Sequence, residues 1–287
     1  MVVMGQESTL LRHWSGDGDM MGALELESRY RALLDAVACS GVLLKRRQQS
    51  IVSSNSFITK ADNSIVTTAD LESQTLLVDA LVQFAPSPFS IISEEEGEFA
   101  RPTEGSLWFL DPLDGTAHYA KGRLDYAILL SEWRDRRPVF SVVHYPATGE
   151  LGWAHEAMIG FESSVVTGTP SVLTQLCYIS DENLRSDVQR RTGGACVQDA
   201  TESTRALFDL AAGKLSGAVI QVCGHGAWDL AASTHLVLAS GGFVCDESGA
   251  ALDMNDPTVT CKFVVAARDR AMGLLLLGAL NGKSYAG

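Results

Sequence analysis

Residues 108–116 read Trp-Phe-Leu-Asp-Pro-Leu-Asp-Gly-Thr, an apolar run that passes directly into a turn with two carboxylates. We expect a buried strand that ends at Asp111, because the proline after it cannot donate a ladder hydrogen bond. Gly115 lets a ligand approach the backbone, and Thr116 can begin a short helix whose free N–H groups bind an anion. Asp111 and Asp114 beside such a helix suit a hard cation together with phosphate. Asp-Pro and Asp-Gly are also ordinary turn formers, so this stretch alone leaves both interpretations open.

Three other segments place carboxylates where chemistry could use them. Residues 91–97 (Ile-Ile-Ser-Glu-Glu-Glu-Gly) carry three acids at the end of an apolar strand, which a nearby cation would stabilise; a solvated acidic loop is the alternative. Asp229 begins an apolar helix, and a helix-capping role is its alternative. Asp70 lies in the first turn of another helix, after a polar stretch that begins at Lys60.

The rest of the chain alternates between helical and strand-like patterns. Two helices come first, then a run of short strands, and then strands that alternate with helices. We expect helices at 23–49, 69–84, 181–191, 203–213, 228–240 and 269–280, and strands at 89–92, 107–111, 126–130, 139–143, 151–153, 176–179, 217–222 and 263–266. This order indicates a layered α/β fold.

Three regions divide the chain in this interpretation. Residues 1–22 are polar and contain several glycines, which predicts a flexible extension. Residues 23–165 are expected to form an N-terminal α+β subdomain that carries most of the candidate acids. Residues 166–287 are expected to form a C-terminal α/β subdomain that supplies Asp229. Active sites of such folds lie at strand ends and helix starts, so we expect the site between the two subdomains.

The composition argues against several classes of function. The 287 residues include 22 Lys and Arg against 35 Asp and Glu, a net charge of −13, which argues against binding a nucleic-acid polymer. No apolar run reaches the roughly 18 to 20 residues of a membrane span, and the first residues lack the order of a signal peptide. The six cysteines show no CxxC spacing and lie in apolar segments. They predict reduced core thiols in a cytoplasmic protein.

Four segments together resemble the inositol monophosphatase family in their order and spacing. They are residues 60–70 (Lys-Ala-Asp-Asn-Ser-Ile-Val-Thr-Thr-Ala-Asp), 93–95 (Ser-Glu-Glu), 111–116 (Asp-Pro-Leu-Asp-Gly-Thr) and 228–232 (Trp-Asp-Leu-Ala-Ala). The resemblance extends over about residues 24–280. This superfamily holds magnesium-dependent, lithium-sensitive phosphatases, including 3'(2'),5'-bisphosphate nucleotidases, histidinol phosphatases and fructose-1,6-bisphosphatases. The resemblance implies the α-β-α-β-α sandwich of the inositol monophosphatase and fructose-1,6-bisphosphatase type.

The resemblance also implies two or three magnesium ions and their ligands. Glu94, Asp111 and the carbonyl of Leu113 would hold the first ion. Asp111, Asp114 and Asp229 would hold the second, and Glu94 would contribute to a weaker third. Magnesium prefers carboxylate oxygens and keeps several of its waters, which fits this set of acids.

Catalytic and phosphate-binding roles follow from the same resemblance. Asp70 and Thr116 correspond to the pair that orients and deprotonates the attacking water, and Glu94 is the third catalytic residue. The amides of Gly115 and Thr116 would receive the phosphate. Phosphate monoesters need charge neutralisation, a nucleophile at neutral pH and a stabilised leaving oxygen, and paired metal ions supply all three.

The candidate substrate pocket departs from the family pattern at four positions, one of which is Leu124 in place of a frequent Pro. His118 stands where many members have Asn or Glu, and packing at the rim is its alternative role. Glu202 stands where members commonly have Gly, and Val222 where inositol-preferring members place a Glu. A valine side chain accepts no hydrogen bond from a ring hydroxyl, and Glu202 adds negative charge. We therefore expect inositol 1-phosphate to be a poor substrate and the leaving group to be neutral or cationic.

Four further residues are interpreted as structural. His144 and His235 lie in apolar runs, where a buried, hydrogen-bonded histidine is expected. His225 is expected to be exposed in a loop, and lining the site is its alternative. Cys223 is expected to be a small buried residue, and facing the pocket is its alternative.

The sequence thus predicts a metal-dependent phosphatase that acts on a small phosphorylated metabolite: a nucleotide or nucleoside, sugar, cyclitol or amino-alcohol phosphate. The stretch at 60–64 tilts the prediction toward bisphosphate nucleotidases, with inositol and histidinol phosphatases as alternatives. A phosphate-binding protein without turnover is the alternative from another class. A homodimer is expected because dimers are common in the family.

Overall fold

The computed structural model describes residues 20–60, 64–85, 88–95, 105–162, 173–197, 202–254 and 258–282. Most of the predicted extension at 1–22, and the predicted subdomain boundary at 165/166, lie outside these residues. Residues 20–22 already belong to the first helix, α1 (Met20–Ser54), which begins before the predicted residue 23 and ends after residue 49.

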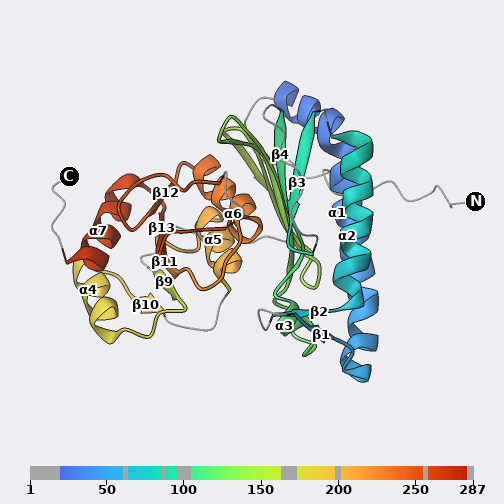
Figure 1. The fold of residues 1–287 in the computed structure, drawn as a ribbon. Coiled ribbons are helices and arrows are strands. Elements are labelled where there is room, and N and C mark those ends of the chain that lie inside the picture. The colour runs from blue at the N-terminus through green and yellow to red at the C-terminus, as the bar shows by residue number, and fades with distance from the viewer. Residues whose placement is uncertain are drawn as a thin grey trace, which may run out of the picture.

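Five layers of helices and sheets make up the fold (Figure 1). Helices α1 and α2 (Thr68–Phe84) cover one face of a six-stranded sheet. Helices α5 (Ser203–Ala211) and α6 (Ala227–Ala239) lie between this sheet and a five-stranded sheet. Helices α4 (Glu182–Thr192) and α7 (Arg270–Asn281) lie on the outer side of the second sheet. The predicted α-β-α-β-α sandwich is confirmed.

The six-stranded sheet is antiparallel except at one edge. Its order is β3 (Phe89–Ser93), β4 (Ser106–Asp114), β5 (Ala127–Arg134), β6 (Arg137–Tyr145), β7 (Glu150–His155) and β8 (Met158–Phe161). Because β3 and β4 run parallel, their C-terminal ends meet at the same edge of the sheet. The sequence did not predict β8, in which Gly160 weakens the strand pattern. A Cβ at Gly160 would lie 2.4 Å from the Trp153 ring, so close packing explains the glycine.

Strand β4 is longer than the sequence predicts. It continues through Asp111 and the following proline to Asp114, so the expectation that the strand ends at Asp111 is wrong. The pairing of β4 with β5 shifts register between Asp111 and Asp114, which marks a bulge. A proline at a bulge lacks only an N–H that the ladder does not use, and the strand therefore continues past it.

The five-stranded sheet is mixed. Its order is β10 (Cys196–Val197), β9 (Thr174–Cys177), β11 (Gly217–Gln221), β13 (Phe263–Ala267) and β12 (Phe243–Asp246). The first three strands are parallel, and β13 runs antiparallel to both of its neighbours. The sequence did not predict the two edge strands, which have two and four residues, because so short a run shows no clear alternation.

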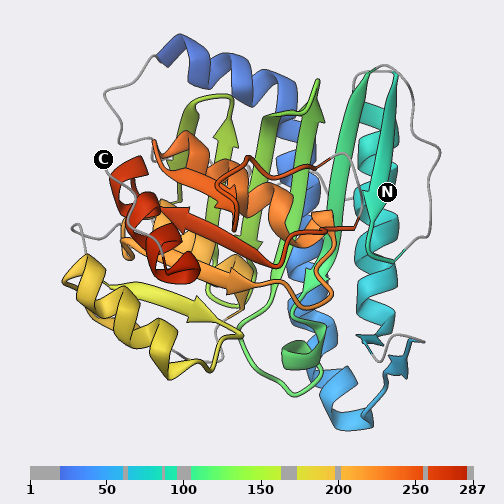
Figure 2. The same cartoon turned by 60° about the vertical axis from the view of Figure 1, so that its left-hand side comes forward.

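Three short elements complete the fold near one end of the six-stranded sheet. Strands β1 (Ile58–Thr59) and β2 (Ile65–Val66) form a hairpin, and α3 (Thr116–Tyr119) follows β4 directly. They lie together at the lower end of Figure 1. In Figure 2 the C-terminal half lies in front of the six-stranded sheet and α1 lies behind it. The C-terminal end of β4 therefore lies where the two halves of the molecule come together.

Apolar side chains fill the spaces between the layers. Trp108 and Tyr30 are buried between the N-terminal helices and the six-stranded sheet. Phe208 of α5 is buried between the two sheets. Among the described helices, none is both long enough and apolar enough to cross a bilayer.

The six cysteines are all free thiols, but they are not all in the core. Cys177 and Cys245 are buried, as the sequence predicts. Cys39 and Cys223 are exposed, so the prediction of core thiols is wrong for these two. Cys223 follows the end of β11, where the chain has left the sheet, and its burial was predicted only from its apolar neighbours.

Candidate active site

Three aspartates from the two halves of the chain converge at the end of β4. Asp111, Asp114 and Asp229 each present a carboxylate oxygen, and these oxygens lie within 4.8 Å of one another. Residues three apart on a regular strand point to opposite faces, and the bulge in β4 changes that alternation between Asp111 and Asp114. Asp229 joins them from the first turn of α6.

The cluster is electrostatically unfavourable without a cation. Burial raises the pKa of Asp111 well above its usual range, and repulsion from Glu94 and Asp114 adds to the effect. Burial, followed by the charge of Glu202, raises the pKa of Asp114 to about 7. Burial and then Asp114 raise the pKa of Asp229. Among the ion pairs of the described residues, none involves these three aspartates. One buried and two half-buried carboxylates without a cationic partner fit a divalent cation with oxygen ligands.

Two of these aspartates also order the local backbone. Asp229 Oδ2 accepts a 2.6 Å hydrogen bond from the N–H of Gly226 and so caps α6. Asp111 Oδ1 accepts a 2.9 Å bond from the N–H of Leu113. The capping interpretation of Asp229 is therefore correct, and it does not exclude membership of the acidic cluster.

A second acidic group, after the end of β3, contacts Lys60, the residue that follows β1. Ser93 pairs with Leu110 in the parallel ladder, so Glu94 follows beside Asp111. Glu94 and the buried side chain of Glu95 both bind Lys60, whose Nζ lies 3.1 Å from Glu94 Oε1 and 2.9 Å from Glu95 Oε2. Glu94 thus has a cationic partner, unlike the three aspartates.

Lys60 and Glu95 are site neighbours to which the sequence assigned no role. Burial, followed by the charge of Glu94, raises the pKa of Glu95 to about 7. Burial acts to lower the pKa of Lys60, but Glu94 and Glu95 raise it overall. Both residues stand within the segments that resemble the family, which was the signal available for them.

Asp70 and Thr116 are in direct contact, as their predicted pairing requires. Thr116 Oγ1 lies 2.9 Å from Asp70 Oδ1 and 2.9 Å from the carbonyl oxygen of Leu113. Asp70 Oδ2 accepts bonds of 2.9 and 2.6 Å from the backbone N–H and the hydroxyl of Thr67. Burial raises the pKa of Asp70, although the bonds from Thr67 and Thr116 oppose this shift. Asp70 is therefore a buried carboxyl aimed at one site hydroxyl.

Gly115 begins α3 in a conformation that favours glycine. Its φ of 79° is left-handed, and a Cβ there would lie 2.9 Å from the carbonyl oxygen of Asp125. Its N–H bonds to the Asp114 carboxylate, which lowers the pKa of that group against the effect of burial. The glycine thus turns the chain from the acidic cluster into the first turn of α3.

The predicted pocket residues His118 and Glu202, which come from the two halves of the chain, face each other. His118 Nε2 lies 3.4 Å from Glu202 Oε1. His118 Nδ1 lies 2.7 Å from Asp125 Oδ2 but is not aligned for a hydrogen bond. The hydroxyl of Tyr178 donates to Glu202 Oε2. The sequence missed Asp125 and Tyr178, because neither belongs to a recognisable motif.

The loop after β11 differs from what the sequence predicts. Val222 is half-buried and packs against the apolar cluster between the sheets. His225 is half-buried rather than exposed, and its Nδ1 accepts a 3.1 Å bond from the N–H of Cys223. The other ring nitrogen, Nε2, lies 3.1 Å from Ser203 Oγ and is then the protonated one. The start of α5 packs on His225, so the prediction that His225 is exposed is wrong. Cys223 is left exposed, so the prediction that it is buried is also wrong.

Comparisons with known proteins point to one family. The profile of the inositol monophosphatase family matches residues 25–276. The inositol-1-monophosphatase ImpA of Mycolicibacterium smegmatis is 31% identical over 232 residues, which are 74% of this chain and 79% of the relative. The 3'(2'),5'-bisphosphate nucleotidase CysQ of Aggregatibacter actinomycetemcomitans is 27% identical over 209 residues, 65% of this chain and 74% of the relative. Among solved structures, the Thermotoga maritima IMPase matches with a TM-score of 0.68 at 21% identity, covering 91% of this chain and 99% of that one.

Proposed function

Since this chain belongs to the inositol monophosphatase family of phosphoric monoester hydrolases, we propose that it uses Mg²⁺ to hydrolyse the phosphate monoester of a small metabolite. The observation that carries this proposal is the cluster of buried Asp111 with half-buried Asp114 and Asp229, whose carboxylate oxygens lie within 4.8 Å of one another. Such a cluster destabilises the fold unless a cation joins it, so its presence is accounted for by metal binding.

The ligand assignments are part of this proposal. Glu94, Asp111 and the Leu113 carbonyl would hold one ion, and Asp111, Asp114 and Asp229 another. Glu94 would have to turn from Lys60 Nζ, 3.1 Å away, in order to contribute. Magnesium there supplies charge neutralisation for the phosphate and acidifies the attacking water.

Asp70 and Thr116 would activate that water. When the Thr116 hydroxyl donates to Asp70 Oδ1, the lone pairs of Thr116 Oγ1 can accept a hydrogen bond from water. The water proton then passes to Thr116 Oγ1 as the threonine proton passes to Asp70. A buried carboxyl with a raised pKa suits this role, because it takes up a proton more readily at neutral pH.

The phosphate would lie at the start of α3, on the amides of Gly115 and Thr116. The N–H of Gly115 bonds to the Asp114 carboxylate, and it would have to turn to the phosphate as that carboxylate turns to a cation. Metal and phosphate binding are therefore expected to support each other.

The leaving-group side favours a neutral or cationic group over a second phosphate. Glu202 and Asp125 place two carboxylates beside His118, and Val222 offers no hydrogen bond to a ring hydroxyl. We propose a nucleoside, amino-sugar or amino-alcohol phosphate as substrate. Two named relatives act on inositol 1-phosphate and on 3'(2'),5'-bisphosphate nucleotides, and these compounds are the comparison substrates. The cytoplasmic location and the homodimer stay predictions.

A panel of four phosphate esters tests the proposal. Phosphate release would be measured for inositol 1-phosphate, adenosine 3',5'-bisphosphate, a nucleoside 5'-monophosphate and histidinol phosphate, with Mg²⁺ and with excess chelator. We expect release that depends on Mg²⁺, with histidinol phosphate or the monophosphate preferred. Binding of phosphate without release from any ester would favour the non-catalytic alternative. A preference for inositol 1-phosphate would contradict the proposed pocket.

A further inference from the structure

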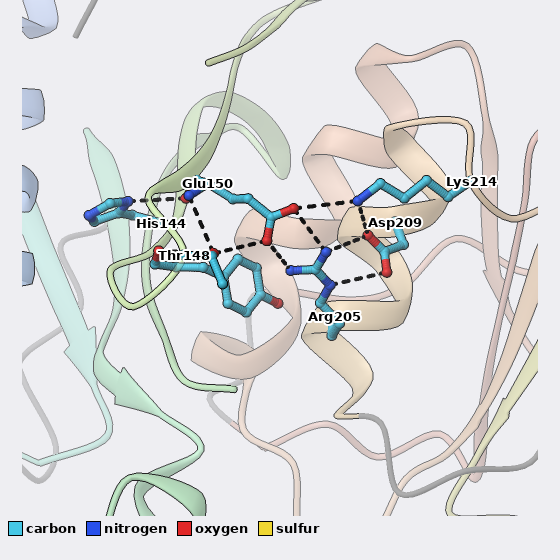
Figure 3. Close-up of polar contacts among 7 residues, drawn as sticks. His144, Thr148, Glu150, Arg205, Asp209 and Lys214 are labelled. Carbon is cyan, nitrogen blue, oxygen red and sulfur yellow. Dashed lines mark hydrogen bonds and ion pairs between the residues drawn. The ribbon is translucent and has the colours of Figure 1, made fainter. Parts of the chain in front are cut away.

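An ionic cluster outside the metal site joins α5 to the six-stranded sheet (Figure 3). Glu150 lies at the start of β7, while Arg205 and Asp209 lie one turn apart on α5. We call these three residues the Glu150 clamp. Lys214, after the end of α5, lies 3.4 Å from Glu150 and 3.0 Å from Asp209.

Arg205 forms two bidentate ion pairs at once, one with Glu150 and one with Asp209. Its Nη1 and Nη2 lie 2.6 and 3.0 Å from the two carboxylate oxygens of Glu150. Its Nε and Nη2 lie 3.0 and 2.9 Å from the two oxygens of Asp209. The guanidinium carbon also lies 4.8 Å from the centre of the Tyr145 ring. A guanidinium held by two bidentate pairs and a ring allows little freedom of rotation.

The clamp is built to remain ionised. Hydrogen bonds from Arg205 lower the pKa of Glu150 to about 2 against the effect of burial. The side chains of Arg205 and Glu150 are 23% and 12% exposed, so solvent screens the pair much less than a surface salt bridge.

The residue before Arg205 reaches the proposed metal ligands. Thr204 is fully buried, and its Oγ1 lies 3.3 Å from the backbone oxygen of Asp229. Its hydroxyl also bonds to the Asp114 carboxylate. The single hydroxyl proton of Thr204 therefore lies between acceptors from β4 and α6, the two elements whose aspartates must stay close together.

We infer that Arg205 and Glu150 are positioning residues: by fixing the rotation of α5, they hold Thr204 between Asp114 and Asp229 and so set the separation of these two carboxylates. The inference rests on the proposed function, because it takes these aspartates as metal ligands. Among the described residues, no clamp residue forms a hydrogen bond or ion pair with the three aspartates, so a geometric effect on metal binding would pass through α5.

Apolar packing alone would not fix this rotation. Burial of the apolar side chains of α5, which include Ala206, Leu207 and Phe208, stabilises the fold. The hydrophobic effect has no preferred direction, so it does not select one rotation of the helix. A rotation of about 15° moves a side-chain tip on a helix of about 5 Å radius by about 1 Å. A displacement of about 1 Å at a catalytic site can cost about 10²-fold in rate. The directional bonds of Arg205 supply what the apolar face cannot.

The test is a titration of the full-length protein with Mn²⁺ followed by electron paramagnetic resonance. We expect Arg205→Met and Glu150→Gln to raise the Mn²⁺ dissociation constant by about 10- to 100-fold, the usual effect of losing a group that orients metal ligands. Thr204→Val, which keeps the volume and removes the hydroxyl, should act in the same direction.

Two control variants separate positioning from charge and from stability. Lys214→Met removes one positive charge from the same neighbourhood but leaves both bidentate ion pairs of Arg205 intact. It should change the Mn²⁺ dissociation constant by less than about 2-fold. Val188→Ala removes buried volume from α4 on the far side of the second sheet, and it should lower Tm without affecting Mn²⁺ binding.

Each outcome decides the question. Wild-type affinity in Arg205→Met or, should that variant not fold, in Glu150→Gln and Thr204→Val overturns the inference while the proposed function stands. An equal loss of affinity in Val188→Ala or Lys214→Met overturns it as well, because stability or charge would then account for the effect. A wild-type protein that binds no Mn²⁺ overturns both the proposed function and the inference.

Discussion

Asp70 Oδ1 lies 2.9 Å from the hydroxyl of Thr116, a residue 46 positions further along the chain, while Asp70 Oδ2 holds the N–H and the hydroxyl of Thr67. One oxygen of the Asp70 carboxylate therefore caps the start of α2, and the other orients the hydroxyl of Thr116. The two functions use different atoms, so they can be separated by mutation.

Thr116→Val should reduce kcat by about 10²- to 10⁴-fold, the range for loss of general-base assistance, and leave Mn²⁺ affinity unchanged. Thr67→Ala is the matched control on the other oxygen of Asp70. It should cost about 1 kcal/mol of stability through the lost cap and leave kcat nearly unchanged. Steady-state kinetics and thermal unfolding measure both effects, and a loss of metal affinity in Thr116→Val would contradict the assigned role.

Asp111→Asn should reduce Mg²⁺-dependent turnover by more than about 10²-fold. Losing a group that only orients metal ligands already lowers metal affinity or activity by about 10- to 100-fold. The same change should stabilise the metal-free protein by about 1–2 kcal/mol, because it removes the buried member of a group of three like charges and keeps an oxygen for the Leu113 N–H. Calorimetric Tm values with chelator and with saturating Mg²⁺ check both signs. Turnover above a few per cent of wild type would show that Asp111 is not a ligand.

Glu202→Gly should change substrate preference. Removing this charge should raise kcat/KM for adenosine 3',5'-bisphosphate relative to histidinol phosphate by about 10-fold, a difference of about 1.4 kcal/mol. Helix α5 should tolerate the change, because Glu202 makes no side-chain cap hydrogen bond and glycine is acceptable at an N-cap. Glu182→Gln removes an exposed acid from α4 and is the control. Unchanged ratios for all four esters in Glu202→Gly would remove Glu202 from the pocket.

His235 should stay neutral in the folded protein well below pH 6. Its Nε2 lies 2.9 Å from the carbonyl oxygen of Glu156 and must donate, so Nδ1 accepts from Ser141, 2.8 Å away. Burial lowers the pKa of His235 to about 4.

Between the folded pKa of about 4 and the unfolded value of about 6.5, the unfolded chain binds more protons than the native state. The contribution of His235 to stability is therefore full above pH 6.5 and is lost as the pH falls toward 4. Urea unfolding should show that wild type exceeds His235→Gln in stability by less at pH 4.5 than at pH 7. An NMR titration that places the imidazole pKa of His235 above 6 would contradict this.

The acidic cluster could be predicted from the sequence because its members stand at the ends of elements. Asp111 and Asp114 lie in one continuous stretch, and Glu94 follows a strand that can pair in parallel with it. The approximate layers followed from the order of helices and strands. The exact end of β4 did not follow, because a proline at a bulge and a proline that ends a strand look the same in a sequence.

Side-chain partners from distant segments could not be predicted. Glu150 and Arg205 are 55 residues apart, and nothing in either segment indicates that they form a pair. The same holds for His225, whose burial depends on Ser203 at the start of α5. Such contacts are decided by how distant segments of the chain pack together, which local sequence patterns do not record.

In evolutionary terms, the site aspartates are maintained by different pressures. Asp70 and Asp229 each cap a helix with one carboxylate oxygen, so selection for folding alone would retain them. Asp111 and Asp114 belong to a group of like charges whose burial weakens the metal-free fold. If selection for turnover ceased, substitutions of Asp111 and Asp114 would be expected before substitutions of Asp70 and Asp229. All four are present in this sequence, which is the expected result for a protein that has kept its turnover.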